Sequence, residues 1–132
     1  MNDLVKNKEN SLIGLLHSKN NGISEKMPYE RDIFLFDTFI AGTSYVDNID
    51  EIEQLLQENS RLNFYRETAN KYDDNAIVIK TESGQKVGYI PKNDNIVFSR
   101  LMDAGKLLFG KVSEKKKKGK WLKIYIRVYL HE

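Results

Sequence analysis

Hydrophobic and polar positions alternate most regularly over residues 121–130. One face of this segment carries only aliphatic side chains: Leu122, Ile124, Ile126, Val128 and Leu130. The opposite face carries aromatic and basic side chains: Trp121, Lys123, Tyr125, Arg127 and Tyr129. A side-chain period of two is that of a β-strand with one face in the core. The pattern therefore predicts a C-terminal strand with a buried aliphatic face.

Shorter runs rich in β-branched and aromatic residues predict the other strands. They cover residues 31–45, 61–67, 75–81, 86–91 and 106–114, and the first of them is expected to be buried on both faces for part of its length. The segment ESGQ at 82–85 predicts a hairpin turn. The segment KKKKGK at 115–120 predicts the turn before the final strand. Gly88, inside a predicted strand, indicates a bend or a close approach of the backbone.

Three segments have helical spacing. Residues 48–58 place Ile49, Ile52, Leu55 and Leu56 on one face, with acidic residues near the N-terminal end, where the helix dipole favours them. Residues 94–104 are predicted to form the second helix, with an aspartate at the N-cap and with Gly105 ending the helix. Residues 1–19 carry a helical apolar stripe, and 20–30 contain Asn, Gly and Pro and predict a linker.

These elements predict a mainly β (α+β) protein. The expected architecture is a small, partly open antiparallel β-barrel, of the OB or SH3-like kind, with about six strands and two short helices. The domain boundary is expected between a helical N-terminal extension with its linker, residues 1–30, and a barrel domain, residues 31–132.

Composition excludes several classes of site. The chain has no cysteine and two histidines, His17 and His131, near opposite ends. Thiol nucleophiles and cysteine-based zinc sites are thus excluded, and no metal site or cofactor is expected. We find no phosphate-binding loop, nucleophile elbow or zinc-protease motif, so we expect no catalytic residues. No apolar run reaches membrane-spanning length and the N-terminus lacks a signal pattern, so the expectation is a cytoplasmic protein without membrane contact.

Charge is distributed unevenly. Residues 1–66 carry a net charge of −4 and residues 67–132 carry +6. A basic half favours a polyanionic partner, most simply nucleic acid. The aromatic and basic face of the final strand is typical of surfaces that stack unpaired bases and hold phosphates, unless another element covers it. The lysine run at 115–118 either gathers phosphates or forms a solubilising turn that protects a sheet edge.

Two polar segments are candidate binding sites for a ligand, a metal ion or an anion. The turn at 70–76 (NKYDDNA) contains good turn formers, among which Tyr72 must either pack back or present its ring to a ligand. A metal site at Asp73, Asp74 and Asn75 would lack the spacing of a calcium loop. The segment VGYIPK at 87–92 places Lys92 just before a helix N-terminus, where anions bind; the alternative is a simple strand-to-helix corner.

Taken in order, four segments resemble the HIRAN domain family. They are IAGTSY at 40–45, LNFYRE at 62–67, NKYDDNAIVI at 70–79 and VGYIPK at 87–92, and the resemblance extends from about residue 34 to 130. HIRAN domains occur in fork-remodelling ATPases and as stand-alone bacterial proteins. The resemblance implies a small barrel, a setting in DNA repair, and non-catalytic binding of single-stranded DNA at its 3′-hydroxyl end.

The resemblance also implies roles for single residues. Tyr45 and Tyr72 match aromatic residues that stack on bases, and Asp73 matches the carboxylate that accepts a hydrogen bond from the 3′-hydroxyl. Asn70 matches a neighbouring polar contact, and Lys92 matches a lysine that contacts phosphate. Tyr89 matches a position that is histidine in the remodeller version.

Three positions depart from the family pattern. Ser44 stands where the remodeller domains have a DNA-contacting arginine, and Lys71 and Thr68 stand where proline is common. The missing arginine weakens the expected affinity and end selectivity, and Lys71 restores part of the lost charge. A lysine in place of proline also leaves the loop less rigid.

The resulting hypothesis is a binding domain for single-stranded DNA ends, with RNA as a further ligand because stacking and a terminal hydroxyl serve both polymers. A protein-interaction module, with a partner recruited through residues 1–30, is the first alternative. A metal-dependent nuclease or phosphatase at Asp73 and Asp74 is the second.

Overall fold

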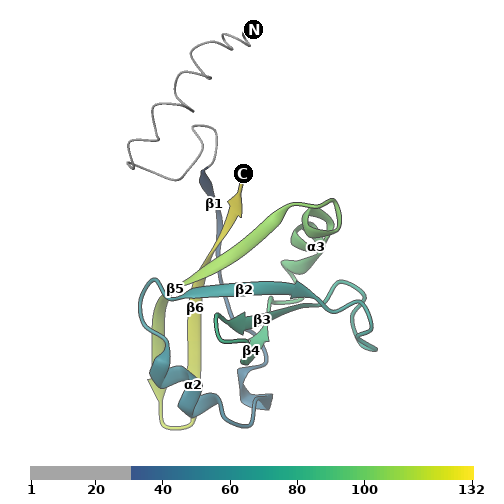
Figure 1. Ribbon diagram of the computed structural model, residues 1–132. Coiled ribbons are helices and arrows are strands. Elements are labelled where there is room, and N and C mark those ends of the chain that lie inside the picture. Colours follow the sequence, from purple (N-terminus) through teal and green to yellow (C-terminus); the bar gives the residue numbers. More distant parts are fainter. Residues whose placement is uncertain (1–30) are drawn as a thin grey trace, which may run out of the picture. The chain divides into compact units, whose positions relative to one another are not determined.

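A computed structural model describes residues 31–132 (Figure 1). The N-terminal helix and linker predicted at 1–30 lie outside the described residues. The elements are β1 (Asp32–Phe39), a 3-10 turn η2 (Thr43–Tyr45), α2 (Ile49–Leu55), β2 (Arg61–Arg66), β3 (Ile77–Thr81), β4 (Lys86–Tyr89), α3 (Asn95–Asp103), β5 (Leu107–Lys118) and β6 (Trp121–His131).

The strands form one six-stranded sheet with the order β1-β6-β5-β2-β3-β4. The pairs β2–β3, β2–β5, β3–β4 and β5–β6 are antiparallel. Strand β1 also runs antiparallel to β6, because the amide of Glu132 bonds the carbonyl of Arg31 while the amide of Ile40 bonds that of Ile124. The result is a half-barrel with two helices, which confirms the predicted fold class.

The two edge strands of this sheet meet at one point. Just after β1, the amide of Ala41 donates to the carbonyl oxygen of Tyr89 at the end of β4, and the amide of Tyr89 donates to that of Ala41, both at 2.8 Å. We call this pair of bonds the barrel seam. Gly88 makes it possible: a Cβ atom there would lie 2.4 Å from the carbonyl oxygen of Ala41. The close approach predicted at Gly88 is therefore confirmed.

The core lies inside the curved sheet. The inward face of β6 is buried as predicted, with Ile124, Ile126 and Val128 fully inaccessible. Helix α2 adds Ile52 and Leu56, and α3 adds Phe98. The other core residues come mainly from the central strands: Leu62, Phe64, Ile77, Ile79, Val87, Leu108 and Val112.

Both helices predicted within the barrel domain are present, and they differ from the prediction in capping and in the exposure of one residue. Helix α3 ends as expected: Gly105 has a φ of 93°, its amide bonds the carbonyl of Met102, and the amide of Lys106 bonds that of Leu101. This is the Schellman arrangement that glycine permits. Asp94 occupies the N-cap position, but its carboxylate accepts from the Thr38 hydroxyl at 2.8 Å rather than capping the helix. In α2, Leu55 was expected on the buried face and is 70% exposed.

The first strand differs from the prediction in length and in burial. It ends at Phe39, because Gly42, with a φ of 76°, turns the chain into the 3-10 turn. Burial on both faces was wrong: Phe34 and Phe36 are 50% and 41% exposed. The cause is topological. Strand β1 is an edge strand with β6 as its neighbour on one side, so Phe34 and Phe36 make ring contacts with Tyr129 and Phe98 and remain partly exposed.

The lysine run also differs from the prediction. Lys115–Lys118 lie in β5, paired with β6, and only Gly119 and Lys120 form the turn. Gly119, with a φ of 61°, permits this tight connection. Beyond Val112, β5 has hydrogen-bonded strand partners only in β6, so the end of the β5–β6 hairpin is a two-stranded ribbon.

Candidate nucleic-acid interface

The segment between β2 and β3, residues 67–76, forms a polar loop held by its own hydrogen bonds. The side-chain oxygen of Asn70 accepts from the amides of Tyr72 and Asp73 at 2.8 and 3.0 Å. The amide of Glu67 also bonds the carbonyl of Ala76 at 3.0 Å, which joins the two ends of the loop. These bonds turn the chain so that Tyr72 stands at the loop tip, 88% exposed. Asn and Asp favour such turns because their side chains bond nearby amides.

Asp73 is fixed on two sides. Its Oδ1 accepts from the amide of Asn75 at 2.9 Å, and its Oδ2 accepts from the Nδ2 of Asn95, at the start of α3, at 2.7 Å. Asn95 is buried, and its other polar atom, Oδ1, has no hydrogen-bond partner among the described residues. Each carboxylate oxygen has two acceptor sites. The Asp73 carboxylate, which is half-buried, can therefore accept a further hydrogen bond from a ligand.

Arg66 ties the loop to β2 and to α3. Its guanidinium donates to the carbonyl oxygens of Ala76 and Asp74 at 2.8 and 3.0 Å, and its Nε donates to the Asp103 carboxylate at 2.8 Å. The side chain of Arg66 is 15% exposed and that of Asp103 is 53% exposed. The planar fork of arginine suits several acceptors at once, which a lysine could not match.

Glu67 links the loop to β4. Its Oε1 accepts from the Tyr89 hydroxyl at 2.6 Å and from the Nδ2 of Asn70 at 2.8 Å. These two hydrogen bonds, the one from Tyr89 being the larger effect, hold the pKa of Glu67 below its ordinary value of 4.5. The ammonium of Lys86 in turn donates to the Tyr89 hydroxyl at 3.0 Å. The ring of Tyr89 is thereby fixed beside the loop.

The barrel seam brings a third segment to the same place. Immediately after Ala41, Gly42 adopts a left-handed conformation, and the following 3-10 turn leaves Tyr45 90% exposed. Tyr45 and the 67–76 loop, which are far apart in the sequence, therefore face the same pocket. Among the described residues, the seam supplies the main-chain hydrogen bonds that join the end of β1 to β4.

The pocket is open and has a volume of about 750 Å³. Tyr45 and Tyr72 line it together with Tyr89, and its charged groups come from Asp73 and Lys92. The ammonium of Lys92 lies 3.5 Å from the carbonyl oxygen of Tyr72 and has no acidic partner among the described residues. The remaining lining residues are Ala41, Gly42, Asn70, Ala76 and Ile90. Aromatic surface, one carboxylate and one ammonium thus meet in a single pocket.

Six of the eight predicted site residues line this pocket: Tyr45, Asn70, Tyr72, Asp73, Tyr89 and Lys92. Lys71 is exposed on the loop and Ser44 is exposed beside Tyr45, and neither is among the lining residues. Ser44 instead borders a second hollow with Lys120, Trp121 and Leu122. The side chain of Asn70 serves chiefly to hold the loop.

Three positioning residues were not singled out from the sequence. Arg66 and Glu67 belong to the quoted segment LNFYRE, but nothing in that segment shows which partners they bind. The sequence does not show which residue Asn95 binds, because the chain must fold before its amide reaches Asp73, 22 positions away. A polar residue on the face of a helix that should be buried was the one available sign.

Residues 31–132 contain neither a cluster of potential metal ligands nor a helix able to span a membrane. No group of three or more histidine, cysteine, aspartate or glutamate side chains is placed to hold a metal ion in this part of the chain. None of its helices has the length and apolar character needed to cross a membrane.

Comparisons with known proteins agree with the fold. The family model of the HIRAN domain matches residues 33–132. A crystal structure of a protein from Lactobacillus plantarum is similar, with 29% identity and a TM-score of 0.73, over 78% of this chain and 98% of that one. The HIRAN domain of human HLTF shares the fold, with 17% identity and a TM-score of 0.60, over 76% of this chain and 78% of that one. A comparison with curated proteins gave no match. HIRAN domains are nucleic-acid-binding modules, and this chain belongs to the HIRAN domain family.

Proposed function

We propose that this domain binds single-stranded DNA at a free 3′-hydroxyl end. The observation that carries the proposal is the pair of tyrosines on one pocket: Tyr45 and Tyr72 are 90% and 88% exposed. Singly scattered exposed aromatic side chains are common, but exposed apolar surface gathered at one place marks an interaction site. Rings of this kind stack on unpaired bases, at about 1–3 kcal/mol per base.

The polar groups of the pocket suit the terminal nucleotide. Asp73 has acceptor sites free for a hydroxyl, and Lys92 offers an unpaired ammonium to the adjoining phosphate. A carboxylate repels phosphate by like charge, so it is favourable here only if it receives a proton donor such as a 3′-hydroxyl. The same repulsion would disfavour a strand that ends in a 3′-phosphate.

The test measures fluorescence anisotropy with a short single strand, its 3′-phosphorylated copy and a blunt duplex. The single strand with a free hydroxyl is expected to bind most tightly. Asp73→Asn should reduce the preference for the hydroxyl over the phosphate. Asp74→Asn is the matched control, because Asp74 is the neighbouring exposed carboxylate and does not line the pocket.

Three outcomes would contradict the proposal. An unchanged preference in Asp73→Asn would remove the role assigned to that carboxylate. Absence of binding to every oligonucleotide would favour a protein-interaction module. Cleavage of the strand with Mg²⁺ or Mn²⁺, lost in Asp73→Ala, would favour a nuclease. A parallel RNA strand of the same sequence tests the choice of polymer.

A further inference from the structure

The lysine run of the β5–β6 hairpin is divided between two faces. Lys115 and Lys117 point to the α2 side, where both bond Glu53, at 2.9 and 3.4 Å, and Lys117 also approaches Asp50 at 3.6 Å. Their charges are therefore largely compensated. The Lys115 hydrogen bond is the main reason that the pKa of Glu53 is lowered.

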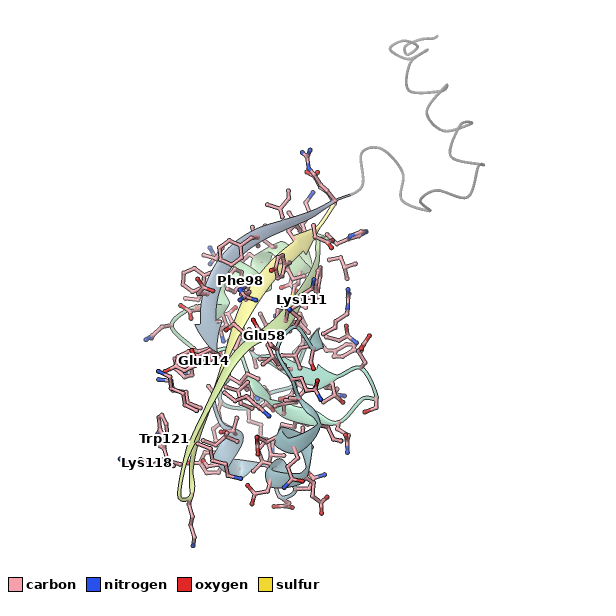
Figure 2. All side chains as sticks on the ribbon, turned by 90° about the vertical axis from the view of Figure 1, so that its left-hand side faces the viewer. Glu58, Phe98, Lys111, Glu114, Lys118 and Trp121 are labelled. Atoms are coloured by element: carbon pink, nitrogen blue, oxygen red, sulfur yellow. The ribbon has the colours of Figure 1, made fainter. Side chains whose placement is uncertain are left out.

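The alternate lysines point the other way. In the antiparallel register Lys116 lies opposite Lys123, and Lys118 lies opposite Trp121. Residues directly opposite share a face of the ribbon, so these four side chains belong together. Figure 2 shows Lys118 and Trp121 at the hairpin tip, on the side away from α2. We call the surface formed by Lys116, Lys118, Trp121, Lys123 and Tyr125 the hairpin face.

The hairpin face carries uncompensated charge. None of its lysines has an acidic partner among the ion pairs of the described residues, and one acid, Glu114, occupies the same side of the ribbon. Lys116 and Lys123 stand directly opposite each other, a like-charge arrangement that destabilises a sheet. Both ammonium groups lie about 5.4–5.5 Å from the Tyr125 ring centre, which offsets part of the repulsion.

Protection of a sheet edge explains lysines but does not explain the tryptophan. Trp121 is 52% exposed at the tip of this basic surface. A strongly hydrophobic ring would promote the association that edge lysines are placed to prevent. Aromatic rings between lysines are instead the arrangement that binds a single strand, by stacking its bases and neutralising its phosphates.

The hairpin face adjoins the pocket. Gly42 lines both the pocket and a smaller hollow of about 230 Å³, which Lys120 and Trp121 of the hairpin border together with Ser44 and with Ile49 and Asp50 of α2. Tyr45, which stacks in the proposed site, directly follows Ser44 in the chain. Toward its other end the outer face of β6 is closed, because Tyr129 stacks on Phe109 at 5.3 Å and meets Phe34 edge-on. The open part is thus the part nearest the pocket.

We infer that the hairpin face binds the nucleotides that lead away from the 3′ end held in the pocket. This inference rests on the proposed function and adds a second, sequence-independent contact region to it. Unpaired bases would stack on Trp121, and phosphates would approach Lys116, Lys118 and Lys123. The basic charge of the hairpin would then serve longer strands and contribute little to the binding of a dinucleotide.

The test uses thymidine oligonucleotides of two to twelve residues with a free 3′-hydroxyl. Trp121 is the one tryptophan of the chain, so its fluorescence reports on this surface alone. Affinity is expected to rise with length, and the fluorescence to be quenched only by strands longer than the pocket accommodates. Trp121→Ala should weaken binding of the longest strand about tenfold and leave the dinucleotide unaffected.

Two double variants that remove the same charge distinguish phosphate contacts on the hairpin face from an effect of the overall net charge. In Lys116→Gln/Lys118→Gln, the salt dependence of the twelve-residue strand should fall by about 1.4 in log–log slope, at about 0.7 per phosphate contact. Arg100→Gln/Lys106→Gln removes the same charge from α3 and from the residue before β5, and should leave the slope unchanged. Equal losses in the two double variants, or an affinity independent of length, would overturn the inference.

The two proposals can fail separately. Dinucleotides with a 3′-hydroxyl or a 3′-phosphate test the pocket without the hairpin face. Lack of preference between them contradicts the end-binding proposal, whatever the long strands do. Quenching of Trp121 by an oligoglutamate as strong as that by DNA would assign the hairpin face to an acidic protein partner instead.

Discussion

The barrel seam gives the sharpest prediction about how the fold supports the pocket. In Gly88→Ala, the new Cβ atom would lie 2.4 Å from the carbonyl oxygen of Ala41 and 2.5 Å from a methyl carbon of Ile40. The first of these atoms belongs to the main chain and cannot rotate away. The substitution must therefore push β1 from β4 and lengthen the two hydrogen bonds between Ala41 and Tyr89.

The cost follows from these contacts. Overpacking of a well-packed site costs about 1–3 kcal/mol. Loss of two main-chain hydrogen bonds costs about 0.5–1.5 kcal/mol each. We expect the free energy of unfolding to fall by about 2–6 kcal/mol, against a total of about 5–15 kcal/mol for a domain of this kind. The variant should still fold, but with the Tyr45 side of the pocket displaced, and its affinity for a single strand should fall about tenfold.

Urea denaturation and fluorescence anisotropy on the same preparations test this prediction. Gly84→Ala is the control: Gly84 has a φ of 92°, and a Cβ atom there would meet no atom within 4 Å. It should cost about 1–2 kcal/mol through backbone strain alone and leave binding unchanged. A loss below about 0.5 kcal/mol in Gly88→Ala, or equal affinities in the two variants, would refute the reasoning.

Three further predictions concern the 67–76 loop and the exposed tyrosines. Because hydrogen bonds lower the folded-state pKa of Glu67, its contribution to stability is complete above its ordinary pKa of 4.5 and is lost as pH falls through the folded value. Urea titrations at several pH values should therefore show a smaller acid-induced loss in Glu67→Gln than in the native chain; parallel losses would contradict this. Arg66→Lys should lower the free energy of unfolding by about 1–3 kcal/mol, whereas Arg100→Lys, on the exposed side of α3, should change it little. Tyr72→Ala should weaken strand binding about tenfold in anisotropy titrations, with little effect on stability, whereas Tyr65→Ala, an exposed tyrosine outside the pocket, should leave affinity unchanged.

Local patterns in the sequence were sufficient for most of the secondary structure. The alternation over residues 121–130 correctly assigned the buried face of β6, because a period of two leaves few other ways to bury five aliphatic side chains. Gly105 marked the end of α3, and Gly88 marked a close approach of the backbone. The turn at 70–76 was also evident, since Asn and Asp bond amides two or three positions away.

The sequence-based predictions were wrong where burial or secondary structure depends on segments that are distant in the sequence but adjacent in the fold. The pattern of β1 suggested burial on both faces, but the strand lies at a sheet edge, and edge position cannot be read from its own residues. The lysine run suggested a turn because charged residues favour solvent. It forms a strand instead, since pairing with β6 and the carboxylate of Glu53 provide partners on one face.

The candidate site shows the same division. The sequence by itself determined the chemical groups: a tyrosine among turn residues, a carboxylate in the same turn and a lysine before a helix. Only the tertiary structure decided that Tyr45 shares a pocket with Tyr72, because that requires the seam between residues 41 and 89. It also decided which lysines keep a free charge, through the acids of α2 on one side of the ribbon. Short-range periodicity fixes which way a side chain points, whereas contacts between distant segments depend on how the whole sheet closes.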